Sequence, residues 1–211
     1  TFKRYVSKQV VDELLDDDAK LNLGGEEREV TVLFSDIRGF TNMSEKMRPE
    51  DVVSTLNEYF SDMIDIVFKH NGTLDKIIGD ELMIVYGAPI SAEDDTERAV
   101  TTAVEMQERI LELNKTRKKQ KKKPIQVGMG INRGVVVSGN IGSRDMMDYT
   151  VIGDTVNLGS RLCSAAGPGE ILVSRTVWKE IKETFVCKKL KPVRVKGKKD
   201  KVGVYRIASS S

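Results

Sequence analysis

A pair of apolar runs joined by a tight turn constrains the fold of this chain more than any other feature. The runs lie within Leu74–Tyr86, are rich in β-branched residues, and are separated by Gly79 and Asp80. Glycine can adopt a positive φ, and aspartate tolerates turn geometry. The sequence therefore predicts a β-hairpin with a carboxylate at its tip.

A second carboxylate lies at the end of an upstream run that is typical of a strand. This run, Glu29–Phe34, leads through Ser35 into Asp36, and a helical pattern follows directly. If this strand and the hairpin pair in one sheet, Asp36 and Asp80 converge as hard oxygen ligands beside backbone amides that suit phosphate. The pair points to a two-metal nucleotide site. Taken alone, the two aspartates would also fit simpler roles, as a helix cap and as a solvated turn residue.

The composition fits a single catalytic-size domain with an N-terminal lead-in. The chain has 211 residues and a hydrophobic content of 39%, which is enough to bury a core. No apolar run approaches the roughly 20 residues that span a bilayer, and no signal peptide opens the chain. We expect a cytoplasmic catalytic domain, which could be part of a membrane-anchored protein.

The cysteine and histidine content argues against zinc and against histidine-based catalysis. Cys163 and Cys187 lack metal-ligand spacing, so we expect two free, mostly buried thiols in a reducing compartment. The single histidine, His70, ends a helical pattern and is expected at a helix C-terminus.

We divide the chain into three parts. Residues 1–27 are expected to form an amphipathic helix and a polar linker that includes Gly24-Gly25, residues 28–208 the catalytic domain, and residues 209–211 a tail. An amphipathic helix needs a partner, and the chain does not begin with Met. We therefore expect an upstream sensor or membrane-anchored regulatory domain.

The order of the remaining segments sets the fold class. A helical region breaks at Pro49, and a long helix is expected from an N-cap at Ser91. Two antiparallel strands joined at Asn132-Arg133, a short strand and a further helix follow: Ile125–Ile131, Gly134–Ile141, Tyr149–Ile152 and Thr155–Ala166. The order strand, two helices, hairpin, helix, strand predicts a ferredoxin-like, palm-like α+β fold, whose antiparallel-rich sheet carries helices on one face.

A basic run ends the long helix. Seven of the nine residues in Lys115–Lys123 are Lys or Arg, and no aromatic residue is interleaved for base stacking. We expect a solvated surface loop here in preference to a contact with an acidic membrane or with nucleic acid. No nucleic-acid partner is expected.

Three motifs, in this order along the chain, resemble the catalytic domains of class III adenylyl and guanylyl cyclases. They are Phe34-Ser35-Asp36-Ile37-Arg38-Gly39-Phe40-Thr41, Lys76-Ile77-Ile78-Gly79-Asp80, and the segment Tyr149–Leu162, which reads YTVIGDTVNLGSRL. The resemblance extends from about Glu29 to Ile207. It implies the class III nucleotidyl cyclase fold and a bacterial-type adenylate cyclase that converts ATP to 3′,5′-cyclic AMP and pyrophosphate.

The resemblance also implies two divalent metal ions, Mg²⁺ or Mn²⁺. Their ligands would be the side chains of Asp36 and Asp80 and the carbonyl of Ile37. One ion would lower the pKa of the ribose 3′-hydroxyl that attacks the α-phosphorus, and the other would hold the phosphates. Backbone amides at the start of the following helix would bind the triphosphate, namely those of Gly39, Phe40 and Thr41.

The other implied site residues recognise the nucleotide. By resemblance, Lys76 donates to adenine N1 and Thr150 meets the 6-amino group, whereas guanylyl cyclases carry Glu at the first position, so ATP is favoured. Asn157 and Arg161 lie four apart on one helix face, and they would orient the ribose and stabilise the transition-state phosphate. Phosphate contacts are further expected from Lys196, with Lys198 as the alternative, and from Arg144.

Family members place these residues in two shared sites across a head-to-tail homodimer. The aspartates come from one chain, and the base, ribose and phosphate residues from the other. Two alternatives remain open. A diguanylate cyclase carries a Gly-Gly-Asp/Glu-Glu-Phe hairpin similar to Ile78–Leu82, and a catalytically weak, nucleotide-binding regulatory module would share the fold. This chain retains both aspartates and the Asn157–Arg161 pair.

Overall fold

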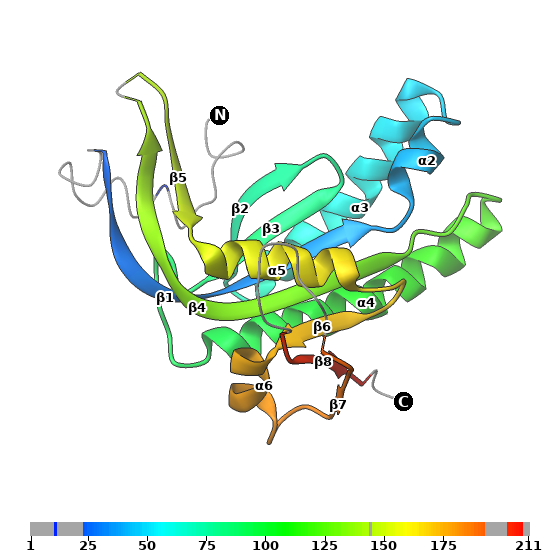
Figure 1. Ribbon diagram of the computed structural model, residues 1–211. Coiled ribbons are helices and arrows are strands. Elements are labelled where there is room, and N and C mark those ends of the chain that lie inside the picture. Colours follow the sequence, from blue (N-terminus) through cyan, green and yellow to red (C-terminus); the bar gives the residue numbers. More distant parts are fainter. Residues whose placement is uncertain (1–10, 12–22, 144, 193–201, 209–211) are drawn as a thin grey trace.

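The computed structural model describes residues 11, 23–143, 145–192 and 202–208 (Figure 1). Three of the predicted features therefore lie outside the described residues. The first is the amphipathic helix expected within residues 1–18, of which only Val11 is described. The others are the tail and the phosphate contacts of Arg144, Lys196 and Lys198. No helix in the described part of the chain is long and apolar enough to cross a membrane.

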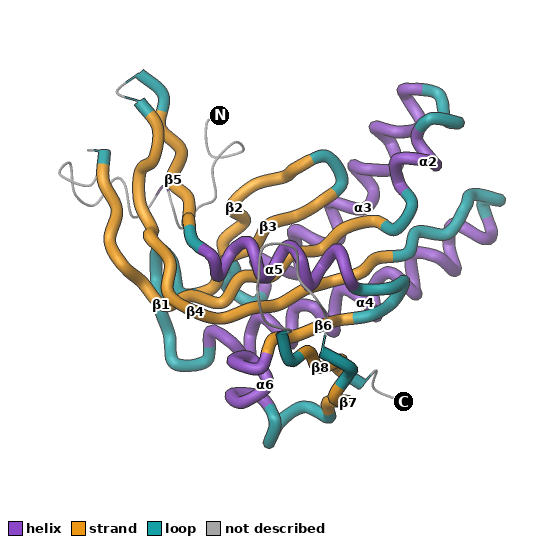
Figure 2. The backbone as a smooth tube through the Cα atoms, viewed as in Figure 1, coloured by secondary structure: helices purple, strands orange, loops and turns teal. Residues whose placement is uncertain are grey.

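The described strands form one twisted sheet (Figures 1 and 2). Its order is β2-β3-β1-β4-β6-β8-β7, and β5 pairs with the outer part of β4. Among these described strands, β4 and β6 are the only parallel neighbours, and all other neighbours pair antiparallel. The strands are β1 (Gly24–Ile37), β2 (Thr73–Ile78), β3 (Glu81–Tyr86), β4 (Val127–Gly142), β5 (Met147–Ile152), β6 (Ile171–Ser174), β7 (Cys187–Lys189) and β8 (Val204–Ile207).

The two longest strands, β1 and β4, pair from Gly24 opposite Asn140 to Ile37 opposite Val127. The prediction of two strands joined at Asn132-Arg133 is therefore wrong. Both residues lie inside the ladder, and Asn132 Nδ2 donates to the carbonyl of Thr155 at 2.8 Å, so this dipeptide forms no turn. The same pairing places Gly24-Gly25, which we expected in a linker, at the start of β1.

The predicted hairpin is confirmed as β2 and β3, and Gly79 adopts a φ of 65° at its turn. Helices α2 (Phe40–Ser44) and α3 (Pro49–Lys69) follow β1, and α3 begins at the proline as expected. His70 caps the C-terminus of α3, where its Nε2 lies 2.6 Å from Glu105 Oε2.

Helix α4 (Asp95–Lys119) differs from the prediction at both ends. It begins at Asp95 and not after Ser91, because the Asp95 carboxylate accepts the amide of Ala92 at 3.0 Å and closes a turn before the helix. Most of the predicted basic loop is helical. Arg117 is buried, pairs with Glu58 and donates to the carbonyl of Lys123 at 2.8 Å, so this end of the basic run is anchored to the fold.

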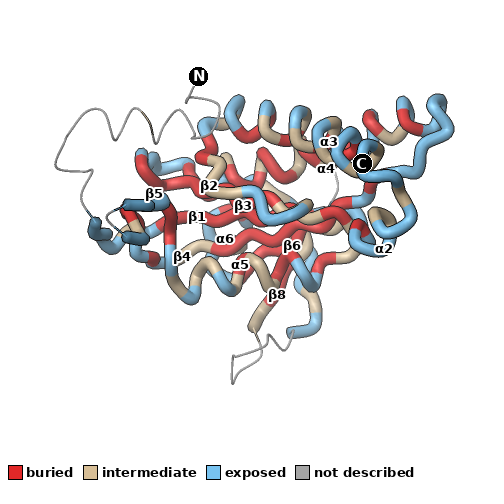
Figure 3. Tube along the Cα trace, turned by 90° about the horizontal axis from the view of Figure 1, so that it is seen from above, coloured by how far each residue is buried: buried red, intermediate tan, exposed pale blue. Residues whose placement is uncertain are grey.

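Helices cover both faces of the sheet, and the prediction of one covered face is wrong (Figures 1 and 3). Helices α3, α4 and α6 (Arg175–Ile181) pack on the side to which Leu33, Ile84 and Ile131 point. Helix α5 (Asp154–Ala165) covers the opposite side, where it meets Val32 and Phe34. Alternate residues of β1 are thus buried in two different clusters.

Close approach between α5 and β4 depends on a residue without a side chain. A Cβ at Gly130 would lie 2.1 Å from the amide nitrogen of Cys163 on α5. This close approach of Gly130 to Cys163 sets the distance at which α5 lies over the sheet.

The two cysteines agree with the prediction of free, mostly buried thiols. Cys163 is buried and Cys187 partly buried, and both thiols are free.

We predict that Gly130→Ala lowers the free energy of unfolding by about 1–3 kcal/mol, which corresponds to a fall in Tm of roughly 3–10 °C, because backbone atoms must move. Gly203→Ala is the matched control, since a Cβ there would meet nothing within 4 Å. Thermal melts of both variants test the prediction, and an unchanged Tm for Gly130→Ala would contradict it.

Candidate active site

The two predicted metal-binding aspartates converge where β1 ends beside the hairpin turn. Ser35 lies opposite Leu82 in the β1–β3 ladder, so the next residue, Asp36, reaches the turn that carries Asp80. Burial and the neighbouring Asp36 carboxylate raise the pKa of Asp80 to about 6. Burial, with the charge of Asp36, also raises the pKa of Glu81 to about 7. Three carboxyl groups therefore crowd one partly buried position.

Arg38 supplies the positive charge closest to this cluster. Its Nη2 donates to Asp36 Oδ2 at 2.6 Å, and its Nη1 reaches the carbonyl of Ala166 at 3.4 Å. The guanidinium thereby joins the end of β1 to the end of α5. Sequence reasoning assigned no role to Arg38 or Glu81. The only sequence signal was their position beside the two aspartates.

The residues at this position fit a divalent cation. In the described part of the chain, no group of three or more His, Cys, Asp and Glu side chains could hold a metal alone. Mg²⁺ characteristically takes one or two carboxylates and completes its shell with water and substrate phosphates. Asp36, Asp80 and the carbonyl of Ile37 match that donor set, and a cation would offset the repulsion that raises the pKa of Asp80.

A buried hydroxyl pair fixes the strand end that carries Asp36. Ser35 Oγ and Tyr59 Oη lie 2.8 Å apart, and both residues are fully buried between β1 and α3. Burial raises the pKa of Tyr59, so its hydroxyl stays protonated and able to donate. The pair holds the backbone immediately before Asp36 against α3.

We predict that Tyr59→Phe lowers the free energy of unfolding by about 1–3 kcal/mol, because the Ser35 hydroxyl is left buried without its partner. Adding Ser35→Ala should recover part of that loss, with a coupling free energy of about 0.5–1.5 kcal/mol. Urea unfolding of both single variants and the double variant completes the cycle. Strictly additive effects would show that the two hydroxyls do not interact.

The predicted triphosphate amides open the short helix α2. Gly39 precedes the helix with a φ of 70°, Phe40 is buried, and Thr41 is exposed. The first N–H groups of a helix have no partner within it. The amides expected at the phosphates therefore follow Asp36 directly, with Phe40 as the apolar anchor of the turn.

The predicted base-reading residues form a second group. Lys76 is on β2 and Thr150 on β5, and both contact the carboxylate of Asp75. Thr150 Oγ1 donates to Asp75 Oδ2 at 2.9 Å, and Lys76 Nζ lies 3.3 Å from the same oxygen. Lys76 also pairs with Asp148 at 3.1 Å. Sequence reasoning brought Lys76 and Thr150 together only by resemblance, and it missed Asp75.

Asn157 and Arg161 lie four residues apart on α5, as predicted. Asn157 is exposed, Arg161 is partly exposed, and neither side chain forms a hydrogen bond or ion pair with another described residue. Likewise, no hydrogen bond or ion pair among the described residues joins Asp36 or Asp80 to the base-reading group. The site residues thus fall into separate groups within one chain.

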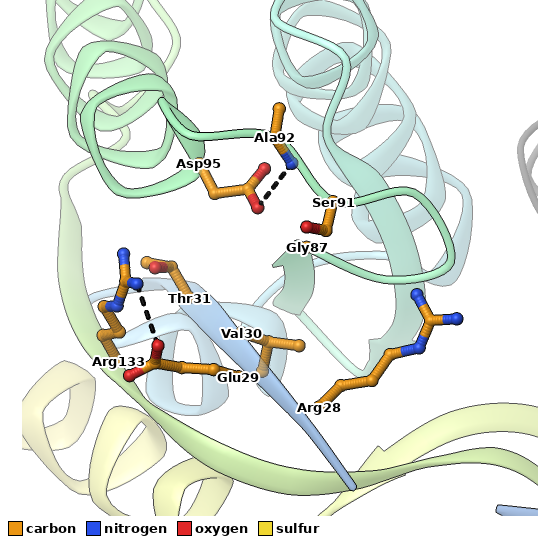
Figure 4. A pocket seen from close by; sticks show the side chains of 9 residues that line it. All are labelled: Arg28, Glu29, Val30, Thr31, Gly87, Ser91, Ala92, Asp95 and Arg133. Atoms are coloured by element: carbon orange, nitrogen blue, oxygen red, sulfur yellow. Dashed lines mark hydrogen bonds and ion pairs between the residues drawn. The ribbon is translucent and has the colours of Figure 1, made fainter. Parts of the chain in front are cut away.

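The structure also contains a polar cavity of about 280 Å³, which includes none of the predicted site residues (Figure 4). It lies where β1 and β4 pass the loop before α4. Arg133 pairs with Glu29 at 3.0 Å on one side, and Asp95 accepts the Ala92 amide on the other. Its charged side chains are paired within the protein.

Comparison with known proteins identifies the family. A model of the adenylate and guanylate cyclase catalytic domain matches residues 25–209. The chain belongs to this family. The match confirms the predicted family, and the solved structures described next confirm the fold class.

The cyclase domain is similar to curated relatives that are named adenylate cyclases. It is 30% identical to adenylate cyclase 1 of Rhizobium meliloti over 98% of this chain and 31% of the relative. It is 35% identical to an adenylate cyclase of Anabaena cylindrica over 85% of this chain and 37% of the relative. The chain spans about a third of the length of these curated relatives.

Solved structures give the same result for the fold. The cyclase domain matches the adenylyl cyclase CyaB from P. aeruginosa with a TM-score of 0.86 and 38% identity, over 90% of this chain and 98% of that one. It matches the guanylyl cyclase Cya2 with a TM-score of 0.82 and 40% identity, over 90% and 96% of the two chains. Since similarity extends to both nucleotide classes, the choice of base depends on particular residues.

Proposed function

We propose that this domain is an adenylate cyclase, which converts ATP to 3′,5′-cyclic AMP and pyrophosphate. The observation that carries the proposal is the juxtaposition of Lys76 and Thr150 around Asp75. The adenylate cyclases among the relatives support it. The family assignment favours it over the diguanylate cyclase alternative.

The chemistry of the base edge explains the preference for ATP. Adenine presents an acceptor at N1 and a donor at the 6-amino group, whereas guanine presents a donor at N1 and an acceptor at O6. Lys76 can only donate, so it complements adenine N1 and opposes the guanine N1–H. Thr150, whose hydroxyl proton is directed to Asp75, offers lone pairs to the 6-amino group.

Two divalent ions, Mg²⁺ or Mn²⁺, are part of the proposal. Asp36, Asp80 and the Ile37 carbonyl would hold them, and the bound ions would lower the pKa of the attacking hydroxyl and offset phosphate charge. The chain's own residues do the remaining work. Arg38 keeps the Asp36 carboxylate in place, and the amides of Gly39, Phe40 and Thr41 would bind the triphosphate.

Asn157 and Arg161 are proposed to act on the ribose and on the phosphorus centre. Both side chains project from α5 without a partner among the described residues, so neither has to break a contact to bind substrate. Asn157 would orient the ribose so that its 3′-hydroxyl faces the α-phosphorus. Arg161 would stabilise the charge that develops on the phosphate oxygens. Arg144 and Lys196, or Lys198, are proposed as further phosphate contacts.

We propose a head-to-tail homodimer with two shared sites. Asp36 and Asp80 of one chain would face the base, ribose and phosphate residues of the other. An exposed apolar pair on the paired strands β4 and β5 supports an interface there. Val137 and Ile152 lie directly opposite each other and are 42% and 52% exposed. We also propose that a sensor or membrane-anchored regulatory region controls the domain and that the domain lies in the cytoplasm; the greater length of the relatives leaves room for such a region.

Replacement of either aspartate tests the catalytic assignment. We predict that Asp36→Ala and Asp80→Ala each lower kcat for metal-dependent cyclic AMP formation by about three orders of magnitude or more, with an unchanged Tm. Asp65→Ala, which removes an exposed carboxylate on α3, should leave kcat unchanged. Products are identified by mass after incubation with Mn²⁺ and either ATP or GTP. Appreciable turnover by Asp36→Ala would contradict the assignment, and binding without turnover by the unaltered domain would favour a regulatory module.

Complementation tests the shared sites. We predict that Asp80→Ala and Asn157→Ala, each inactive alone, recover activity when mixed, because a heterodimer contains one intact site. Random mixing makes about half of the dimers heterodimers with one good site each, so recovery should approach roughly a quarter of the unaltered activity. The control is a mixture of Asp80→Ala with Asp36→Ala, which leaves no intact site. No recovery despite demonstrated subunit exchange would show that the sites are not shared in this way.

A further inference from the structure

Asp75 occupies an irregular position in the hairpin. The β2–β3 register shifts between Leu74, opposite Ile84, and Lys76, opposite Met83, so Asp75 is the extra residue of a β-bulge. Bulges redirect side chains from the regular alternation of a strand. The Asp75 side chain is only 4% exposed, whereas that of Lys76 is 34% exposed. The bulge thus turns a carboxylate inward beside an accessible lysine.

One oxygen of this carboxylate serves both proposed base-reading residues. Asp75 Oδ2 accepts the Thr150 hydroxyl at 2.9 Å and lies 3.3 Å from Lys76 Nζ. Burial raises the pKa of Asp75, while Lys76 and Thr150 act in the opposite direction and favour its charged form. A buried carboxylate of this kind needs both partners. The contact also joins two strands, β2 and β5, that are not neighbours in the sheet.

The direction of the Thr150 hydrogen bond has a chemical consequence. A hydroxyl has one proton and two lone pairs, and an ionised carboxylate only accepts. Thr150 must therefore donate its proton inward to Asp75, which leaves lone pairs for a ligand. Thr150 is then an acceptor toward the base, suited to a 6-amino group and opposed to a 6-oxo group.

We propose that Asp75 is a specificity-determining positioning residue, which selects adenine over guanine by fixing the hydroxyl of Thr150 as an acceptor and by holding the Lys76 ammonium beside it. The inference rests on the proposed function, since it takes Lys76 and Thr150 as the residues that meet the base. Asp75 itself does not touch the substrate and acts only through these two side chains.

Asp75→Leu is the variant that separates this role from a structural one. The Asp75 oxygen that accepts from Thr150 also faces Lys76, so an amide would keep its oxygen there and preserve the hydrogen bond, whereas leucine has nearly the shape of aspartate and offers no acceptor. The Thr150 proton is then released to point at a base, where it meets guanine O6. We predict that the ratio of kcat/KM for ATP to that for GTP falls by roughly 10- to 100-fold, the size of one unsatisfied or reversed buried hydrogen bond.

Asp148→Asn is the matched control. Asp148 also contacts Lys76, at 3.1 Å, but it is 66% exposed, and the hydrogen bond of the Thr150 hydroxyl goes to Asp75. Both variants remove one negative charge beside Lys76, and only Asp75→Leu removes the acceptor of the Thr150 hydroxyl. We expect Asp148→Asn to change the ATP-to-GTP ratio by less than about 3-fold, as an exposed ion pair contributes little. In a Thr150→Val background the hydroxyl is absent, so Asp75→Leu should lower the ATP-to-GTP ratio by less than it does in the unaltered domain.

The decisive measurement is kcat/KM with each nucleotide for the unaltered domain and these variants. A proportional fall in both activities with an unchanged ATP-to-GTP ratio for Asp75→Leu would overturn the inference and leave a structural role. A similar change of ratio in Asp148→Asn would also overturn it. If the unaltered domain does not prefer ATP, the proposed function fails first, so the two failures are distinguishable.

A measurement on the unaltered protein keeps the inference testable if Asp75→Leu does not fold. N6-methyl-ATP and 6-methoxypurine riboside triphosphate have the same bulk and the same acceptor at N1, and they differ in carrying a donor or an acceptor at position 6. We predict that the first inhibits cyclic AMP formation with an inhibition constant at least about 10-fold lower, because Thr150 accepts. Equal inhibition would overturn the inference.

Discussion

The long antiparallel pairing of β1 with β4 is the constraint on which the rest of the structure depends. It extends from Gly24 opposite Asn140 to Ile37 opposite Val127. At one end of the pairing, Asp36 lies beside the turn of the β2–β3 hairpin. Near the other end, Gly139 of β4 lies opposite Thr150 of β5. This single ladder of backbone hydrogen bonds thus positions Asp36 directly and Thr150 through β5. Because alternate residues of β1 enter two separate cores, a slip of one residue would exchange the two faces and misplace Asp36.

The end of this ladder that carries Asp36 concentrates negative charge. Asp36, Asp80 and Glu81 are partly buried, and burial together with the neighbouring carboxylates raises the pKa values of Asp80 and Glu81. Arg38 offsets part of that charge at 2.6 Å from Asp36. In the proposed function, a divalent ion would offset the remaining negative charge. Crowded carboxyl groups with raised pKa values are common at functional sites.

Sequence reasoning predicted the elements with strong local signals and failed where tertiary contacts decide. The Gly79-Asp80 turn and the Pro49 helix start follow from backbone chemistry, and both are present. Asn132-Arg133 has the composition of a turn, yet a continuous partner strand and the Thr155 carbonyl keep it extended. The basic run was predicted as a loop because its charge pattern cannot reveal that Arg117 is buried against Glu58.

The same limit applies to the site. Asp36, Asp80, Asn157 and Arg161 were predicted through the motifs that contain them, and their division into separate groups was predicted from the family resemblance. Asp75 was missed because a β-bulge leaves no signature in residue types, and because its hydrogen bond comes from Thr150, 75 residues later in the chain. From the sequence alone, a carboxylate next to a lysine is interpreted as an ordinary surface ion pair, because its burial is not known.

The hairpin has one further consequence for the proposed dimer. Strand β2 carries Lys76 and the turn carries Asp80, four residues later, within one rigid two-stranded unit. In a dimer with shared sites these two residues serve different substrate molecules. A tilt of one hairpin would therefore displace the base contact of one site and the metal contact of the other at the same moment. Nucleotide binding at the two sites would then be thermodynamically linked, and by reciprocity each bound nucleotide would change the affinity for the other by the same factor.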